Sequence, residues 1–187
     1  VIADIVALSG DILLGYLDDK DLSQLPNSNY LGNLDTISLY TGKASFIVGI
    51  GDNQTRKKIM EKLNVAWYTA IHPSAVIGSD VTIGEGSAVF ANAVINTRSR
   101  LGRGVIVNTA ATVDHDSILG DYAHISPGVH LGGTVFIGPE TWIGIGATVI
   151  NNVAISEKCI IGAGAVVIQN VNKSGVYIGV PAKPVMK

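Results

Sequence analysis

The chain of 187 residues carries a net charge of −2 and a single cysteine. These values exclude an internal disulfide framework, and without a run of basic residues they give no reason to expect a nucleic-acid partner. No apolar stretch approaches the roughly 18 residues of a membrane-spanning helix. The length suits one repeat domain and a smaller unit, and with a single cysteine a cytoplasmic location is the default expectation.

The first 70 residues have the pattern of a small α/β domain. Helical periodicity predicts helices at residues 1–8, 35–40 and 54–63. Apolar runs predict two buried strands at residues 12–17 and 45–49, with a loop over residues 20–33. This order indicates a Rossmann-like domain over residues 1–70, whose ligands would bind at the carboxyl ends of its strands.

Two segments of this domain are candidate ligand contacts. Asp18 and Asp19 follow the first predicted strand, where carboxylates can accept hydrogen bonds from a ribose or a base edge; the alternative is a solvated turn. Residues 49–53 read Gly-Ile-Gly-Asp-Asn, which lets backbone amides at a helix start approach an anionic group. A plain strand-to-helix turn is the alternative, because the full GxGxxG pattern is absent.

From Ile71 to Asn172 the sequence reads as seventeen six-residue units, each opened by Ile, Leu or Val and carrying a small residue or Val four positions later. A sustained period of six fits neither an amphipathic helix nor strand alternation, and it indicates a stacked solenoid. We therefore predict a mainly β domain over residues 71–172, a parallel β-helix, followed by a tail over residues 173–187. Three units make one coil, so residues eighteen apart stack at a spacing of roughly 4.8 Å.

The outward-pointing residues of the repeat form three faces, and two of them carry apolar stripes. One stripe consists of Ala88, Ile106, His124, Trp142 and Ile160, and the other contains Ile118, Phe136 and Ala154. Exposed apolar stripes imply a partner surface, and a prism of threefold form most simply meets copies of itself in a cyclic trimer. We predict a homotrimer.

Two of the four histidines are candidates for chemistry. His124 interrupts the first apolar stripe, where an imidazole needs a hydrogen-bond partner or a ligand. His115 lies at a corner between two aspartates, and the position one coil further on is Gly133. Because Gly133 has no side chain, a substrate could approach the imidazole while a backbone N–H receives an oxyanion.

Taken together, the motifs resemble the left-handed β-helix acyltransferases. They resemble more closely the bacterial sugar acetyltransferases that join a small Rossmann-like domain to this helix, namely the UDP-4-amino-sugar N-acetyltransferases and the sialic acid O-acetyltransferases. The resemblance covers essentially the whole chain. Its specific motifs are Leu17-Asp18-Asp19, Gly49-Ile50-Gly51-Asp52-Asn53, Ile71-His72-Pro73-Ser74-Ala75, Val113-Asp114-His115-Asp116, Gly120-Asp121-Tyr122-Ala123-His124 and Gly179-Val180-Pro181-Ala182-Lys183.

The resemblance implies a role for each matching residue. His115 would be the general base that takes a proton from the sugar amine, Asp116 would orient its imidazole, and Gly133 would donate to the oxyanion. Asp116 stands where the family usually has Glu, so it is one methylene shorter. The expected acetyl-CoA contacts are His124, Ile145, Gly162, Ala163 and Gly164. The expected nucleotide contacts are Asp18, Asp19, Gly51 and Asn53, joined by a Gly-rich segment with its own His ahead of Val1.

The resulting expectation is an acetyl-CoA-dependent N-acetyltransferase that acts on the amine of a nucleotide-linked amino sugar by direct attack, with no metal. One alternative is an O-acetyltransferase of sialic acid or a related sugar, and another is a non-catalytic or metal-binding scaffold. His115 lies at a corner opposite the face that bears His124. Both can serve one site only if they come from adjacent subunits, so we expect a site at each trimer interface.

Overall fold

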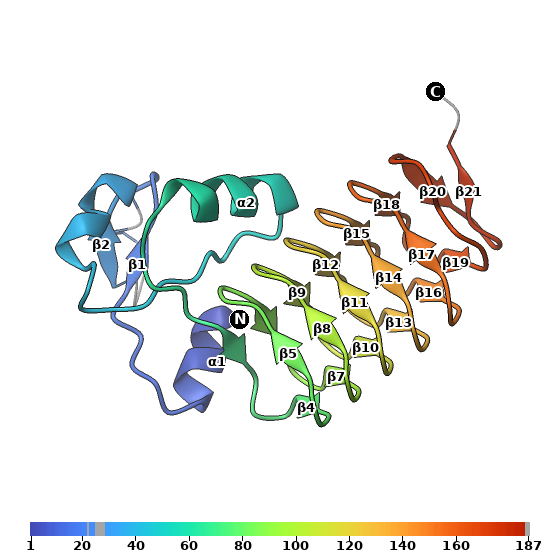
Figure 1. Ribbon diagram of the computed structural model, residues 1–187. Helices are drawn as coiled ribbons and strands as arrows, with labels where there is room; N and C mark the ends of the chain where they lie inside the picture. Colours follow the sequence, from blue (N-terminus) through green and yellow to red (C-terminus); the bar gives the residue numbers. More distant parts are fainter. Residues whose placement is uncertain (22, 25–28, 186–187) are drawn as a thin grey trace.

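The computed structural model describes residues 1–21, 23–24 and 29–185. A long prism of stacked coils carries a small N-terminal domain against its first coils, and the C-terminus lies at the far end (Figure 1). Seventeen two-residue strands, β3 to β19, form the three sides of the prism. The predicted parallel β-helix is confirmed.

Each side of the prism is one parallel sheet. The first face contains β3 (Ala70–Ile71), β6 (Ala88–Val89), β9 (Ile106–Val107), β12 (His124–Ile125), β15 (Trp142–Ile143) and β18 (Ile160–Ile161). The second face contains β4 (Val76–Ile77), β7 (Val94–Ile95), β10 (Thr112–Val113), β13 (His130–Leu131), β16 (Thr148–Val149) and β19 (Val166–Val167). The third face contains β5 (Thr82–Ile83), β8 (Arg100–Leu101), β11 (Ile118–Leu119), β14 (Phe136–Ile137) and β17 (Ala154–Ile155).

The register of the strands is the predicted one. Thr112 pairs with Val94 on one side and His130 on the other, each eighteen residues away. The second residue of each strand is the aliphatic anchor, and the anchors from Val89 to Val167 are buried in one continuous core. Cys159 is fully buried in the same core. The hexad pattern therefore specified both the inward face and the pairing partner of every strand.

Corners join the faces, and we number them by the face that they follow. The first corner runs between the first and second faces, the second corner between the second and third, and the third corner between the third and first. Buried serine and threonine hydroxyls beside these corners are satisfied: Ser99 Oγ donates to the Asp114 carbonyl and accepts from the Ser117 N–H one coil further on. Such ladders let small polar residues occupy the core without an unpaired group.

The N-terminal domain contains α1 (Ile2–Leu8), β1 (Tyr16–Leu17), β2 (Tyr30–Gly32), the 3₁₀ helix η1 (Leu34–Leu39) and α2 (Asn53–Lys62). The three predicted helices are confirmed within one or two residues. The predicted buried strand at residues 12–17 is wrong for most of its length, because only Tyr16 and Leu17 pair and Ile12 is 84% exposed. The predicted loop at residues 20–33 conceals β2, which pairs with β1 in parallel.

The second predicted strand, at residues 45–49, is reduced to a single bridge. Phe46 pairs with Trp67, and the segment adds no further strand to the β1–β2 sheet. Val48 is buried beside Met60 of α2. Burial of these apolar residues therefore comes from packing under α2 and not from a sheet.

The N-terminal domain covers part of the first face. The outward side chains of Ala88 and Ile106 are only 2% and 6% exposed, whereas Trp142 and Ile160 further along the same stripe are exposed. Figure 1 shows α1 and α2 beside these first coils. The prediction that the whole stripe faces a partner is thus wrong for its first part, which the chain covers itself. At the other end, β20 (Val176–Ile178) and β21 (Lys183–Pro184) extend the first face.

Candidate active site

A cleft of about 550 Å³ opens along the second corner. Its lining consists of Asp114, His115, Gly132, Gly133, Thr134, Ile150, Asn151 and Asn152. In the coils that precede the cleft, polar side chains occupy the second corner. Asn96 Nδ2, for example, donates to Asp114 Oδ1 of the next coil at 2.8 Å. The cleft begins where glycines replace these side chains at positions 132 and 133. Its position follows directly from the stacking of residues eighteen apart.

The imidazole of His115 is held from one side only. Asp114 Oδ1 accepts from the His115 backbone N–H at 2.8 Å, and Asp116 Oδ2 lies 2.7 Å from His115 Nδ1. Because a carboxylate can only accept, Nδ1 carries the proton in this pair, and Nε2 of a neutral ring keeps its lone pair. The side chain is 51% exposed, so Nε2 is available to a substrate in the cleft.

The carboxylate of Asp116 has a second partner that the sequence analysis missed. Arg98, one coil below, donates from Nε to Oδ1 at 2.6 Å and from a terminal nitrogen to Oδ2 at 2.9 Å. These hydrogen bonds, followed by the one from His115, hold the pKa of Asp116 well below its ordinary value. The eighteen-residue spacing between Arg98 and Asp116 was the sequence signal that could have revealed the pair.

The absence of a side chain at Gly133 is a steric requirement of this arrangement. A methyl group built on Gly133 would lie 2.6 Å from His115 Nε2 and 2.7 Å from Cε1. The imidazole therefore lies directly over the Gly133 backbone, with Nε2 at the closest point. This contact brings His115, Asp116 and Gly133 together, as the sequence analysis expected.

His124 lies on the first face, between the N-terminal domain and the first corner. Its Nδ1 is 3.3 Å from the Gly51 carbonyl and its Nε2 is 3.2 Å from Asn108 Nδ2. A carbonyl only accepts and an amide nitrogen only donates, so these partners select the neutral Nδ1–H tautomer. Burial, helped by the nearby charge of Arg56, lowers the pKa of His124 to about 4. The ring stacks on Trp142, with centroids 6.1 Å apart.

The other predicted acetyl-CoA contacts lie on the first corner, next to His124. Ile145 is 61% exposed, and the Gly164 N–H donates to its carbonyl at 2.8 Å. Residues 162–164 form the turn of the next coil, where Gly164 adopts a φ of 65°. The first corner thus presents an apolar side chain and a bare turn side by side.

The predicted nucleotide contacts fall into two separate places. Asp18 and Asp19 follow β1; Asp18 Oδ1 accepts from the Lys20 N–H, and Asp19 Oδ1 accepts from the Leu34 N–H at the start of η1. Gly51 and Asn53 lie at the start of α2, against the β-helix. No hydrogen bond among the described residues joins the two places.

Asn53 and its neighbour Arg56 fasten α2 to the third corner. Asn53 is buried and donates from Nδ2 to the Glu140 carbonyl at 3.0 Å. Arg56 is 1% exposed, and its guanidinium donates to the carbonyls of Gly104, Tyr122, Ile50 and Gly51 and to Asn53 Oδ1. The sequence does not reveal that this arginine is buried, because one charged residue in a polar helix resembles a solvated one.

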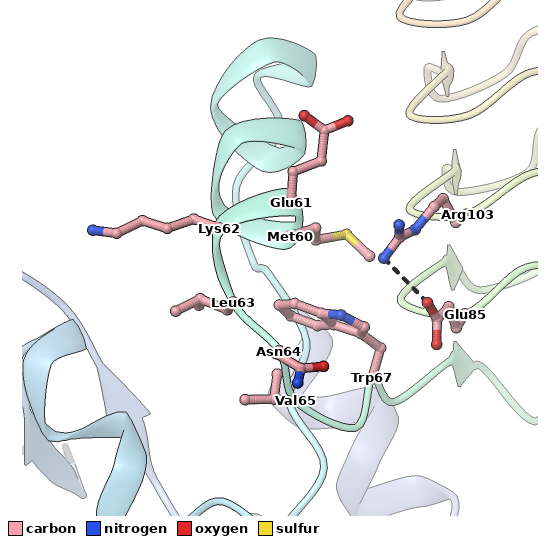
Figure 2. Close-up of a pocket in the computed structure, with 9 residues that line it drawn as sticks. All are labelled: Met60, Glu61, Lys62, Leu63, Asn64, Val65, Trp67, Glu85 and Arg103. Carbon is pink, nitrogen blue, oxygen red and sulfur yellow. Dashed lines mark ion pairs between the residues drawn. The ribbon is translucent and has the colours of Figure 1, made fainter.

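A second cleft, of about 430 Å³, lies between the end of α2 and the third corner. Figure 2 shows Met60 and Trp67 on one side and the Arg103–Glu85 ion pair, 3.1 Å long, on the other. None of the predicted site residues lines it. Within residues 1–21, 23–24 and 29–185, no group of three or more His, Cys, Asp or Glu side chains could hold a metal ion. No helix in the same ranges is long and apolar enough to cross a membrane.

His115 and His124 are not neighbours within one chain. His115 projects from the second corner, and His124 lies on the first face. In a triangular prism the second corner is opposite the first face, so the core separates the two imidazoles. The structure therefore brings together the expected base, its carboxylate and the glycine, but it leaves the expected acetyl-CoA residues on the other side.

Comparisons with known proteins agree on one family. The PglD N-terminal domain family matches residues 1–63. The acetyltransferase domain of PglB from Neisseria gonorrhoeae is 35% identical, with a TM-score of 0.93 over 99% of this chain and 93% of that one. PerB from Caulobacter crescentus, solved with CoA and GDP-perosamine, is 36% identical, with a TM-score of 0.93 over 100% of this chain and 91% of that one.

A curated relative points the same way over a shorter stretch. The UDP-N-acetylbacillosamine N-acetyltransferase of Bacillus subtilis is 36% identical over 47 residues, which span 24% of this chain and 22% of that enzyme. The identity and near-complete coverage of the PglB and PerB matches extend over both the N-terminal domain and the β-helix. The chain therefore belongs to the left-handed β-helix sugar N-acetyltransferases that carry a PglD-type N-terminal domain.

Proposed function

We propose that this protein transfers the acetyl group of acetyl-CoA to the amine of a nucleotide-linked amino sugar. The observation that carries the proposal is the His115 imidazole, tied to Asp116 through Nδ1 and leaving Nε2 over Gly133 in an open cleft. The related PerB structure holds CoA and GDP-perosamine, and the Bacillus subtilis relative is named as an N-acetyltransferase of a nucleotide sugar. These relatives support an amine as the acceptor.

The residues of the cleft divide the chemistry between them. His115 Nε2 accepts a proton from the attacking amine, and Asp116 stabilises the imidazolium that forms. The Gly133 N–H donates to the oxygen that becomes negative during attack. Acetyl-CoA supplies an acetyl group already activated as a thioester: as the C–N bond of the amide forms, the C–S bond breaks, and CoA leaves as a thiol that takes the proton from His115. No covalent enzyme intermediate is required, and the one cysteine is fully buried in the core.

The first face and first corner suit the acetyl-CoA side of the reaction. His124 and Trp142 provide a stacked pair, and exposed Ile145 provides apolar surface beside the bare turn at residues 162–164. A pantetheine arm is long and flexible and alternates methylene and methyl groups with two amides, so a surface that offers apolar contact beside exposed backbone can bind it without a deep pocket. We propose that the tail over residues 173–185 flanks this side; the last two residues of the predicted tail over residues 173–187 lie outside the described residues.

We further propose a homotrimer in which each site lies between two subunits. One subunit contributes His115, and its neighbour contributes His124, the first corner and the nucleotide residues of its domain over residues 1–70. The support is the placement of the two histidines on opposite sides of one prism, together with the exposed parts of both apolar stripes. Because both substrates are cytoplasmic metabolites, we propose a cytoplasmic location.

The function is tested with a panel of acceptors and acetyl-CoA, following release of free thiol. We expect turnover with UDP- or GDP-linked amino sugars and none with the matching hydroxyl sugars, because the related enzymes are named as N-acetyltransferases of nucleotide-linked sugars. The His115→Ala variant is the control for non-enzymatic hydrolysis. Turnover restricted to sialic acid or to another hydroxyl acceptor would show that the acceptor class is wrong.

The shared site is tested by mixing two inactive variants. His115→Ala lacks the base and His124→Ala lacks an acetyl-CoA contact, so each homotrimer should have little activity. After co-expression we expect about one quarter of wild-type turnover, because about one interface in four then pairs an intact His115 with an intact His124. A mixture no more active than its two components would contradict the placement of the site between subunits.

A further inference from the structure

One column of the second corner alternates in charge. Asp80, Arg98 and Asp116 are eighteen residues apart and have φ values of 58°, 60° and 58°. This left-handed backbone is unusual for residues other than glycine, and it gives the three residues the same orientation in successive coils. Their side chains therefore project from the corner side by side, with the cation between two carboxylates.

The Arg98 guanidinium donates two hydrogen bonds to the Asp116 carboxylate in a bidentate arrangement. Nε donates to Oδ1 at 2.6 Å, and a terminal nitrogen donates to Oδ2 at 2.9 Å. The same Oδ2 accepts from His115 Nδ1 at 2.7 Å. A bidentate guanidinium fixes the plane of a carboxylate, so the direction in which Oδ2 faces the imidazole is set by Arg98.

The Arg98–Asp116 ion pair contributes little to the stability of the folded protein. The Arg98 and Asp116 side chains are 58% and 36% exposed, and an ion pair this exposed is screened by water and contributes little to stability. Arg98 does not line the cleft, and its fork is directed at Asp116. A role in orienting the site is therefore the better explanation for its position.

Asp116 needs Arg98 to orient its carboxylate because the aspartate side chain is short. Asp116 is one methylene shorter than glutamate and partly exposed, so without a second partner its carboxylate could rotate and exchange the imidazole for water. Asp114 does not replace it: its Oδ1 accepts from the Asn96 amide and from the His115 backbone N–H, and the side-chain partner of His115 Nδ1 is Asp116. Asp80 acts on Arg98 through its charge.

We propose that Arg98 is a positioning residue for the acetyl transfer proposed above: it holds the Asp116 carboxylate so that Asp116 fixes His115 Nδ1–H and leaves Nε2 aimed over Gly133. Arg98 touches neither substrate in this proposal and acts only through Asp116. His115, Asp116 and Arg98 thus form a chain of hydrogen bonds that runs from the base to the carboxylate to the guanidinium. Arg98 comes from the coil below.

The test compares four variants in steady-state turnover and in the pH profile of kcat/KM. We expect Arg98→Gln to lower kcat by about 10- to 100-fold through misorientation of the base, with little change in the KM for acetyl-CoA. Its acidic limb should move to higher pH, because a carboxylate no longer neutralised by Arg98 stabilises the protonated imidazole more strongly. Asp116→Asn should move the same limb to lower pH, because that stabilisation is lost.

Two further variants distinguish the positioning effect of Arg98 from an effect of its charge and from an effect on folding. Arg98→Lys keeps the charge without the fork, so kcat should fall while the acidic limb stays in place. Adding Asp116→Glu to Arg98→Gln should recover part of kcat, because the longer acid reaches the imidazole without help; a purely structural role would not be rescued in this way. The matched control is Lys158→Gln, an exposed cation at a left-handed corner position with a φ of 54°.

The outcomes distinguish this inference from the function on which it rests. If His115→Ala is inactive while Arg98→Gln matches wild type in kcat and in its acidic limb, only the role of Arg98 is overturned. If His115→Ala retains full turnover, both the role of Arg98 and the proposed function are overturned. Equal shifts of the acidic limb in Arg98→Gln and Lys158→Gln would also overturn the inference, because they would reveal a general charge effect.

Discussion

Replacing His115 with alanine is expected to lower kcat for acetyl transfer by about 10²- to 10⁴-fold, the range that general-base catalysis typically contributes. The imidazole is half exposed, lies over Gly133 and is hydrogen-bonded to the partly exposed Asp116, so its loss should leave the unfolding temperature nearly unchanged. The KM for acetyl-CoA should also change little, since the expected contacts of that substrate lie on another face. The measurement is steady-state release of free thiol with a saturating amino-sugar acceptor.

The matched control for this experiment is His72→Asn. His72 lies at the first coil, where its Nδ1 accepts from the Ser74 N–H at 3.0 Å, and the oxygen of an asparagine can accept the same hydrogen bond. We expect wild-type turnover from this control. Equal losses in His72→Asn and His115→Ala, or no loss in His115→Ala, would show that His115 is not the base.

Replacing Arg56 with methionine is expected to lower the free energy of unfolding by about 2–5 kcal/mol. Arg56 is the main donor to a group of buried carbonyls that join α2 and residues 50–51 to the third corner. Methionine fills a similar volume but donates nothing, and each buried acceptor left without a partner costs about 1–3 kcal/mol. Burial lowers the pKa of Arg56 to about 10, so the guanidinium is still charged at neutral pH.

The same variant should also affect the acetyl-CoA side. Arg56 donates to the Gly51 carbonyl, which in turn holds His124 Nδ1, so freeing residues 50–51 releases the His124 ring from its tautomer and orientation. We expect a raised KM for acetyl-CoA as well as easier denaturation, both measured on the purified full chain. Arg56→Lys should be intermediate between the wild type and Arg56→Met in both measurements, because an ammonium has three donors and cannot reach all of these acceptors.

Lys57→Met provides the comparison for Arg56→Met. Lys57 also ties α2 to the third corner, through a 2.8 Å ion pair with Glu140, but its side chain is partly exposed. An ion pair with a solvent-exposed partner contributes little to stability, so this variant should be almost as stable as the wild type. If Arg56→Met proved as stable as Lys57→Met, the buried arginine would not be what docks α2.

The β-helix and the cleft at its second corner were predictable because both depend on one local rule. Every aliphatic anchor from Ile71 to Val167 recurs at a fixed interval, and stacking residues eighteen apart placed His115 beside Gly133 without knowledge of any distant contact. The same rule, applied to charged residues, would have found Arg98 beneath Asp116. That pair was missed because the sequence analysis followed only apolar and histidine columns.

The N-terminal domain depended on contacts that no local pattern contains. The apolar run at residues 12–17 resembles a buried strand, but nothing packs on Ile12; the polar stretch before Asn33 conceals β2; and Arg56 is fully buried in an otherwise polar helix. The sequence by itself determined the coils, their register and the position of the expected base, because equivalent positions in successive six-residue units have the same surroundings. Only the tertiary structure decided which part of an outward stripe the chain covers with its own N-terminal domain, since burial at a docking surface is set by residues far apart in the sequence.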